Sequence, residues 1–261
     1  MIISSGYTDK GLIREINEDN WYVNEPSPTS KTFYAIVADG MGGHNAGEVA
    51  SNIATTTISE YINNRYSDKL SYDELKGMLL KAVEEANTKI FAESLHSKER
   101  TGMGTTLVMC FVINNKVIVT HVGDSRVYIV RKNTIYKITK DHSLVAQLVE
   151  EGKITEKEAL NHPQKNVITR ALGTDTMVDI DMCEFDLYDG DYILLCTDGL
   201  SNMLTDEEIL TTITESENVI ISPKNLVDRA NENGGNDNIT AVVLKYADIL
   251  NQDEKGMNED E

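Results

Sequence analysis

Residues 33–47 read FYAIVADGMGGHNAG, a strand pattern that runs into an aspartate and several glycines. Five residues of β-type character lead to Asp39-Gly40, and the glycines turn the chain before a helical pattern begins at Ala46. An Asp-Gly pair after a strand is most often only a turn. Mounted rigidly at a strand end, however, a carboxylate beside a glycine carbonyl suits a hard cation such as Mg²⁺ or Mn²⁺.

The chain repeats this arrangement of an aspartate beside glycine or asparagine at the end of an apolar run, and the repetition favours the cation-binding interpretation. Asp124 and Asp198 each follow an apolar run, and Asp237 precedes one. Each of these aspartates stands next to glycine or asparagine. Together with Asp39 they predict one acidic, cation-filled cleft.

The composition bounds the architecture and the partners. The 261 residues carry a formal net charge of −19, and 40% of them are hydrophobic. Because no linker-like segment divides the chain, we expect one large domain over residues 1–246 and a disordered acidic tail over residues 247–261. We expect the protein to be a monomer. The negative charge argues against nucleic acid as a partner, since that binding relies on clustered Lys and Arg.

Location is inferred from what the sequence lacks. No apolar run approaches the ~18 residues needed to cross a bilayer, and the first residues lack the layout of a signal peptide. We therefore expect a cytoplasmic protein without membrane contact. The three cysteines, Cys110, Cys183 and Cys196, lie in apolar or alternating runs and are interpreted as small core residues in a reducing compartment. None begins a Cys-x5-Arg loop, which argues against a cysteine-nucleophile phosphatase.

Apolar spacing predicts the main helices and strands. A helix is expected from Ala46 to about residue 62, and a capping box at Ser71 starts a second helix that ends near Leu95. Short strands joined by two- or three-residue turns follow over residues 105–138, which indicates an antiparallel meander.

The remaining elements complete the expected fold. Residues 142–173 interrupt the strands and are interpreted either as a flap over the cleft or as a passive cover. Ser222 is expected to be an N-cap, with Pro223 at the first helical position. Since the helices are grouped in pairs, we predict an α+β fold in which two packed antiparallel β-sheets are flanked by helix pairs.

Three carboxylates suggest the chemistry. Asp39, Asp198 and Asp237 would be too costly to hold together without a cation, and oxygen ligands select Mg²⁺ or Mn²⁺. Two such ions can lower the pKa of a bridging water and direct it at an electrophile. Arg14 could merely form a surface ion pair with Glu18, but beside a cleft its planar guanidinium matches two phosphate oxygens. The expected electrophile is therefore phosphorus, attacked directly without a covalent enzyme intermediate.

Two other kinds of site are disfavoured. No Walker sequence GxxxxGK[ST] occurs, which argues against a P-loop NTPase. His121 and His142 belong to no HxH or HExxH spacing, so we do not expect zinc there.

Seven motifs resemble those of a known family. They read GYTDKGLIREINEDN, VADGMGGHNAG, TGMGTTLV, HVGDSRVY, NVITRALG, CTDGLSN and GGNDNITAVV. The ordered set resembles the bacterial branch of the PP2C, or PPM, metal-dependent protein serine/threonine phosphatases, and it extends from about Gly6 to Val243. That family's pair of antiparallel sheets flanked by helices agrees with the architecture expected here.

The resemblance implies roles for the residues already singled out. Asp39 would bridge two metal ions, and the Gly40 carbonyl would help to ligate the first. Asp198 and Asp237 would hold the second ion. Arg14 matches the phosphate-binding arginine of the family.

Further acidic positions also have counterparts. Glu18 and Asp19 match residues that contact the metals or their waters. Bacterial members often carry a third metal, for which Asp124 and Asp198 are the matching ligands. The resemblance therefore implies two, or at most three, Mn²⁺ or Mg²⁺ ions per chain.

One departure concerns the general acid. Animal members have a histidine just after the Asp-Gly pair, where this chain has Met41. Either a metal-bound water or His44 would then protonate the leaving group, and for His44 a loop-capping role is an equal alternative.

We expect a Mg²⁺/Mn²⁺-dependent phosphatase that acts on phosphoserine and phosphothreonine in protein substrates and opposes a bacterial-type Ser/Thr kinase. One rival is a catalytically inactive PPM-like scaffold that binds phosphoproteins, against which the intact Asp39, Asp198, Asp237 and Arg14 argue. Another rival is a metal-dependent hydrolase of small phosphate esters or nucleotides.

Overall fold

The computed structural model describes residues 1–24, 32–43 and 46–247. The strands are β1 (Ile2–Asp9), β2 (Asp19–Val23), β3 (Thr32–Met41), β4 (Gly104–Thr105), β5 (Leu107–Ile113), β6 (Lys116–Val122), β7 (Arg126–Arg131), β8 (Thr134–Lys137), β9 (Asp181–Asp186), β10 (Tyr192–Cys196) and β11 (Ile239–Tyr246). The helices are α1 (Ala46–Arg65), α2 (Tyr72–Ser94), α3 (Leu144–Glu150), α4 (Glu156–Leu160), α5 (Asp198–Ser201), α6 (Asp206–Glu215) and α7 (Ser222–Glu232), with a 3₁₀ turn η1 (Lys98–Arg100).

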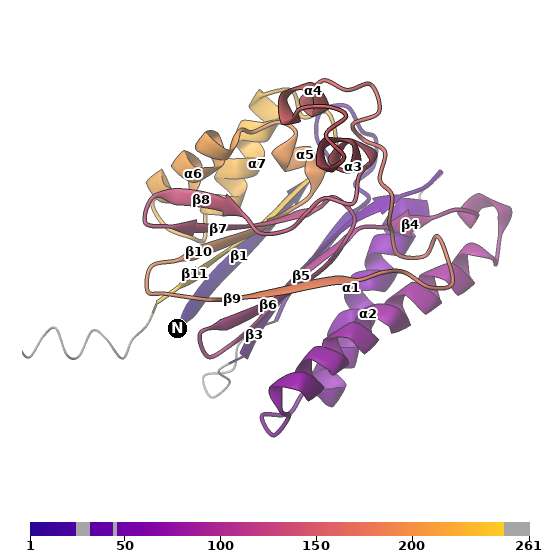
Figure 1. The fold of residues 1–261 in the computed structure, drawn as a ribbon, viewed down its shortest axis with the longest axis horizontal. Coiled ribbons are helices and arrows are strands. Elements are labelled where there is room, and N and C mark those ends of the chain that lie inside the picture. Colours follow the sequence, from indigo (N-terminus) through magenta and orange to yellow (C-terminus); the bar gives the residue numbers. More distant parts are fainter. Residues whose placement is uncertain (25–31, 44–45, 248–261) are drawn as a thin grey trace, which may run out of the picture.

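Two antiparallel sheets pack face to face. Their strand orders are β1-β11-β10-β7-β8 and β2-β3-β5-β6-β9, and β4 pairs with β3. Helices α1 and α2 lie outside the sheet that contains β3, and α6 and α7 lie outside the other sheet (Figure 1). The predicted α+β sandwich is confirmed.

The strand β3 explains why the central strands are apolar on both faces. Tyr34 and Ile36 pack in the core beneath α1 and α2, whereas Ala35 and Val37 pack in the core between the two sheets. Successive side chains of a strand point to opposite faces, so a strand buried on both faces needs a continuous apolar run. A third core, between the sheet that contains β11 and helices α5, α6 and α7, completes the layers.

The helix pair α1–α2 begins and ends close to its predicted limits. Ser71 Oγ accepts a hydrogen bond from the Glu74 N–H, and the Glu74 carboxylate accepts one from the Ser71 N–H, so the capping box is present. Small side chains such as Ala50 and Ala54 are fully buried in α1. They allow this helix to lie close against β3.

Two predicted boundaries are wrong. The strand β3 continues past the Asp-Gly pair to Met41, because β4 pairs with its last two residues. The helix α7 has Ile221 as its N-cap, and Ser222 is already helical and makes no cap. The Asn218 side chain accepts hydrogen bonds from the two N–H groups just before this helix and fixes its start instead.

The segment predicted as a flap, residues 142–173, leaves the sheets after β8 and carries α3 and α4 (Figure 1). Ser143 is bridged to Ile168 and Leu172 to Thr105, so the two ends of the segment are held by backbone pairing. Figure 1 places the segment at the same end of the sandwich as α5, which begins at Asp198.

Some expectations fall outside the described residues. His44 and the acidic tail from residue 248 onward are among them. Within the described ranges, no helix has both the length and the apolar character that a bilayer span requires. The expected single domain and cytoplasmic location stay predictions.

Candidate active site

The space between the two sheets changes from apolar to acidic at one end of the sandwich. Val37 is an inward-facing residue of β3, and Asp39 comes two positions later on the same face. On β2, Trp21 packs against the inner core and Asp19 comes two positions before it. Asp19 and Asp39 lie directly opposite each other in the β2–β3 ladder. The alternation that builds the core therefore also brings two carboxylates to its rim.

Backbone hydrogen bonds hold Asp39 in place. Its N–H donates to Thr106 Oγ1 (3.0 Å), and its carbonyl accepts from the Thr106 N–H (2.8 Å) and from Thr105 Oγ1 (2.9 Å). The next residue has no room for a side chain, since a Cβ on Gly40 would lie 2.1 Å from the Gly47 carbonyl oxygen. The Asp39 carboxylate therefore stands on rigid backbone.

Asp19 is 8% exposed and is held by two buried hydroxyls. Its Oδ2 accepts hydrogen bonds from Thr197 Oγ1 (2.9 Å) and Thr240 Oγ1 (2.7 Å). Its Oδ1 has no partner among the described residues. Burial raises the pKa of Asp19 to about 7, against the effect of the two hydroxyls. A buried carboxylate oxygen without a donor is free to ligate a cation.

Asn238 clamps the loop that carries Arg14. Its Nδ2 donates to the carbonyls of Lys10 (2.9 Å) and Ile16 (2.8 Å) at the two ends of that loop. Its Oδ1 accepts from the Glu18 N–H (2.8 Å). One buried amide thus fixes the arginine loop against the residues that precede β11.

Arg14 lies at the mouth of the acidic group. Its Nη2 is 2.7 Å from Asp237 Oδ2, and its side chain is 50% exposed. Asp237 Oδ1 also accepts from the Asn238 N–H (2.8 Å). Glu18 Oε1 accepts from the Gly47 N–H at the start of α1 (3.1 Å), and burial raises the pKa of Glu18. Because the guanidinium carries five N–H groups, it can contact a further anion while it touches Asp237.

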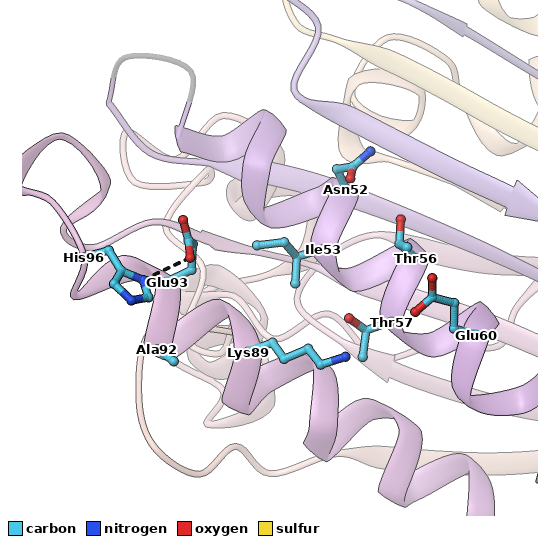
Figure 2. Close-up of a pocket in the computed structure, with 9 residues that line it drawn as sticks. All are labelled: Asn52, Ile53, Thr56, Thr57, Glu60, Lys89, Ala92, Glu93 and His96. Carbon is cyan, nitrogen blue, oxygen red and sulfur yellow. Dashed lines mark hydrogen bonds and ion pairs between the residues drawn. The ribbon is translucent and has the colours of Figure 1, made fainter. Parts of the chain in front are cut away.

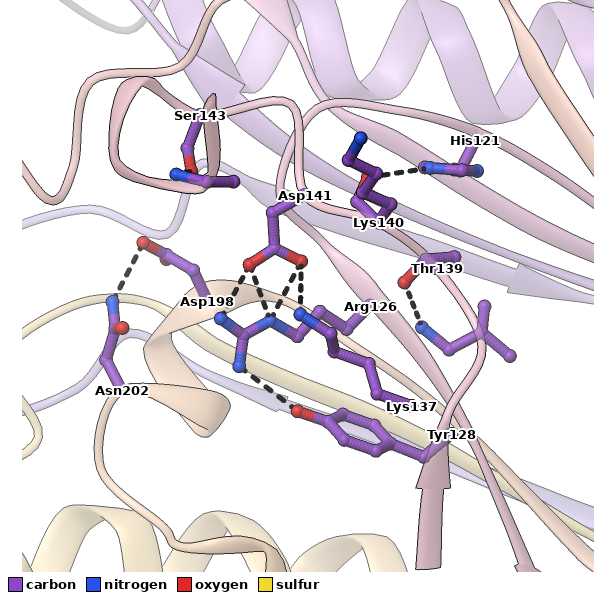
Figure 3. Close-up of polar contacts among 12 residues, drawn as sticks. His121, Arg126, Tyr128, Lys137, Thr139, Lys140, Asp141, Ser143, Asp198 and Asn202 are labelled. Atoms are coloured by element: carbon purple, nitrogen blue, oxygen red, sulfur yellow. Dashed lines mark hydrogen bonds and ion pairs between the residues drawn. The ribbon is translucent and has the colours of Figure 1, made fainter. Parts of the chain in front are cut away.

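Asp198 and Asp124 join the group from the other side. Asp198 begins α5, and Asn202 Nδ2 donates to its Oδ2 at 3.0 Å (Figure 3). Asp124 lies in the turn after β6 and is 8% exposed. Burial raises the pKa of Asp198, and burial together with the charge of Asp198 raises that of Asp124 to about 7.

The five aspartates repel one another. Burial raises the pKa of Asp39 well above its usual range, and four neighbouring charges raise it further: Asp19, Asp198, Asp124 and Asp237. Among the described residues, the only ion pair that any of the five makes is that between Asp237 and Arg14. Divalent cations would supply the missing positive charge, and a set of carboxylate oxygens that includes a free Oδ1 fits Mg²⁺ or Mn²⁺. The predicted site residues are therefore brought together, and their roles as ligands stay predictions.

A second group of potential metal ligands lies beside the aspartates. His121, His142 and Asp181 offer ligand atoms within 4.8 Å of one another. The Gly123 N–H donates to His142 Nδ1 (3.1 Å), so the proton is on Nε2, which lies 3.3 Å from Asp181 Oδ2. Arg170 already pairs with Asp181 at 2.8 Å. His121 Nδ1 has no hydrogen-bond partner among the described residues. Because His142 and Asp181 already have partners, we interpret this group as a polar junction and keep the prediction that zinc does not bind there.

A groove on the helix pair is a weaker candidate. Figure 2 shows it between α1 and α2, lined by side chains that include Thr56, Lys89 and His96. The contact drawn within it is a surface pair, His96 Nδ1 to Glu93 Oε2 at 3.0 Å. The groove lacks the buried, converging carboxylates of the sandwich end, so we place the candidate active site at the aspartates.

The sequence analysis missed the residues that hold the carboxylates. They are Thr105, Thr106, Thr197, Thr240 and Asn238. Threonine is an ordinary strand residue, so its type carries no functional signal. The only available signal was position, since each of the five lies within one of the quoted motifs or next to a site aspartate.

Comparison with known proteins adds independent findings. Residues 6–239 match the family model described as Protein phosphatase 2C. The serine/threonine phosphatase stp of Listeria welshimeri is 37% identical over 238 residues, which cover 91% of this chain and 93% of the relative.

Solved structures agree with this match. The serine/threonine phosphatase Stp1 from Staphylococcus aureus has a TM-score of 0.87 and 32% identity, with 95% of this chain and 96% of that chain covered. The catalytic domain of the serine/threonine protein phosphatase PstP, solved in complex with two manganese ions, has a TM-score of 0.81 and 35% identity, with 95% and 99% covered.

Proposed function

The chain belongs to the protein phosphatase 2C family, and from that membership we propose that it uses Mg²⁺ or Mn²⁺ to hydrolyse phosphoserine and phosphothreonine in proteins. Its substrates would be supplied by a Ser/Thr kinase. The observation that carries the proposal is the cluster of five aspartates, of which Asp19 and Asp124 are buried and whose single described ion pair is that of Asp237 with the exposed Arg14.

Cation binding would be shared among the carboxylates. We assign Asp39, Asp198 and Asp237 to two cations, with help from the Gly40 carbonyl. Glu18 and Asp19 would contact these ions or their waters, and Asp124 with Asp198 would serve a third. When bound, the ions provide a water of lowered pKa and positive charge beside the phosphate oxygens.

Arg14 would bind and orient the substrate. Its guanidinium is half exposed beside Asp237, so it can take two phosphate oxygens with its outer N–H groups. Rigid backbone at Asp39 and the clamped Arg14 loop would hold phosphate and carboxylates in one geometry. The leaving serine or threonine oxygen needs a proton, for which His44 stays one candidate outside the described residues.

Phosphate release from a phosphothreonine peptide tests the proposal. We expect release with Mn²⁺, its loss on chelation and its return when Mn²⁺ is restored. A parallel assay with a nucleotide separates a protein phosphatase from a hydrolase of small phosphate esters. A folded protein that releases no phosphate under any of these conditions would instead support the inactive scaffold.

A further inference from the structure

His142, the first residue of the predicted flap, is buried at 6% exposure and contacts three other segments. Its backbone N–H donates to the Gly123 carbonyl (2.9 Å), and its carbonyl accepts from the Thr169 N–H (2.8 Å) near the far end of the flap. Its ring accepts from the Gly123 N–H and faces Asp181 at the start of β9. The position of His142 is thus tied to both ends of the flap and to β6.

His142 forms hydrogen bonds with both backbone polar groups of Gly123. Its N–H and its carbonyl both bond to His142, and its φ of +101° is one that residues with side chains rarely adopt. A Cβ there would lie 2.7 Å from the side chain of Thr106. The turn that carries Asp124 therefore has a backbone that only glycine fits, held by the ring and the backbone N–H of His142.

The same turn rests on the residue that holds Asp39. Ser125 Oγ lies 2.7 Å from Thr106 Oγ1. The Thr106 hydroxyl also accepts a hydrogen bond from the Asp39 N–H at 3.0 Å. Leu172, at the end of the flap, exchanges backbone hydrogen bonds with Thr105, the neighbour of Thr106. Hydrogen bonds thus join the two ends of the flap, at His142 and Leu172, to the Asp124 turn and to the Asp39 strand end.

An ion pair secures the segment that leads into His142. Arg126 donates to both carboxylate oxygens of Asp141, with Nη2 to Oδ2 at 2.7 Å (Figure 3). Figure 3 also shows the Lys140 carbonyl accepting from His121 Nε2, at 3.0 Å. His121 stacks on the His142 ring with centroids 4.8 Å apart. Its Nε2 is used by the Lys140 carbonyl, and its Nδ1 has no partner among the described residues, so its ring does not hold Gly123.

We propose that His142 is a positioning residue that sets the Asp124 carboxylate relative to the other cleft carboxylates and couples that placement to the flap. Its Nδ1 contact acts on the Asp124 turn. Its Nε2 contact with Asp181 acts on the end of the flap through Arg170, which pairs with the same carboxylate. The inference rests on the proposed cation-dependent function, and it assigns two separable roles to the two ring nitrogens.

Two substitutions separate these roles. In His142→Gln the amide nitrogen can replace Nε2 and keep Asp181, but Gly123 loses its acceptor. In His142→Asn the amide oxygen can replace Nδ1 and keep Gly123, but the contact with Asp181 is lost. His121→Gln is the matched control, because it alters the stacked ring while it keeps a donor for the Lys140 carbonyl.

Calorimetric titration with Mn²⁺ gives a readout that does not depend on activity. We expect His142→Gln to weaken Mn²⁺ binding about tenfold, as is typical for residues that orient metal ligands. His142→Asn should keep the affinity close to wild type and instead raise the KM for a phosphothreonine peptide, with little change on p-nitrophenyl phosphate. His121→Gln should resemble wild type in both measurements.

Amide hydrogen exchange on the wild-type protein gives a test that does not require any variant to fold. In the wild type the Gly123 N–H should be strongly protected, and the ¹⁵N shifts of the His142 ring should report an unprotonated Nδ1. Rapid exchange at Gly123, or wild-type Mn²⁺ affinity in a folded His142→Gln protein, would overturn the inference. An inactive wild type that still binds Mn²⁺ would count against the proposed function and not against this role of His142.

Discussion

Two sets of aspartates in this molecule are treated in opposite ways. Asp191, 2% exposed, accepts hydrogen bonds from Arg131 Nε at 3.0 Å and from Arg131 Nη2 at 2.6 Å. Asp141 forms the same kind of bidentate ion pair with Arg126. Asp19, which is 8% exposed, receives only hydroxyl donors.

The difference separates structural carboxylates from candidate functional ones. A buried charge that has its own arginine is neutralised within the chain and helps to fix the fold. A group of neighbouring carboxylates in which only Asp237 has an arginine partner, the half-exposed Arg14, raises the free energy of the folded protein until an external cation arrives. We call the first set, Asp141 and Asp191, the arginine-paired aspartates, and the second, Asp19, Asp39, Asp124, Asp198 and Asp237, the cleft aspartates.

Asp39→Asn should give the largest effect and tests the comparison directly. Removal of one negative charge from the centre of the cleft aspartates should lower kcat by at least about 10³-fold, or ~4 kcal/mol of transition-state stabilisation. The same change relieves repulsion, so the Tm of the metal-free protein should stay the same or rise. Steady-state kinetics with a phosphothreonine peptide and thermal unfolding after chelation measure the two quantities. Near-normal turnover would contradict the assignment of Asp39.

Asp191→Asn is the same chemical change made in the arginine-paired set. The loss of charge leaves Arg131 without its full partner and should lower the free energy of unfolding by about 3 kcal/mol. For a chain of this size the Tm should fall by roughly 6–12 °C. Activity per folded molecule should not change, since Asp191 does not contact the cleft aspartates. An Asp191→Asn protein of full stability but low activity would reverse the comparison.

The sequence analysis predicted the cleft aspartates but not the contrast between the two sets. Strand ends followed by Asp-Gly identify Asp39 and Asp198 from local pattern, and the order of motifs does the rest. Arg131 and Asp191 are separated by 60 positions in the chain, so no spacing reveals that they pair. For the same reason the junction around His142 could not be predicted, because β6, the flap and β9 meet there only in the folded chain.

Arg14→Ala should have the next effect in size. The side chain is half exposed, and within the described part of the chain its contact with the cleft is the ion pair with Asp237, so its loss should spare the fold. We expect the KM for a phosphothreonine peptide to rise about tenfold, with partial recovery in Arg14→Lys, because a lysine cannot hold two phosphate oxygens in one plane. Arg65→Ala on the surface of α1 is the matched control, since Arg65 stacks on the Tyr61 ring and not on the cleft. An unchanged KM would remove the phosphate role.

Thr240→Val should give the smallest effect and refines the comparison within the cleft itself. The hydroxyl is fully buried and donates to Asp19 Oδ2 at 2.7 Å, so its removal leaves that oxygen with Thr197 alone. A hydrogen bond to a charged group contributes about 1.5–3 kcal/mol. Part of this should be regained when Asp19 shifts toward a bound cation, so we expect a several-fold loss of kcat.

Thr120→Val provides the control for Thr240→Val. Thr120 is equally buried in β6, and its Oγ1 has no partner within the described part of the chain. The same isosteric change should there leave activity intact and the free energy of unfolding equal or higher, because no hydrogen bond is lost and a buried polar atom is removed. Equal loss of activity in both variants would mean that the effect at Thr240 comes from packing. A loss at Thr240 alone would show that cleft carboxylates depend on neutral donors where the arginine-paired aspartates depend on charge.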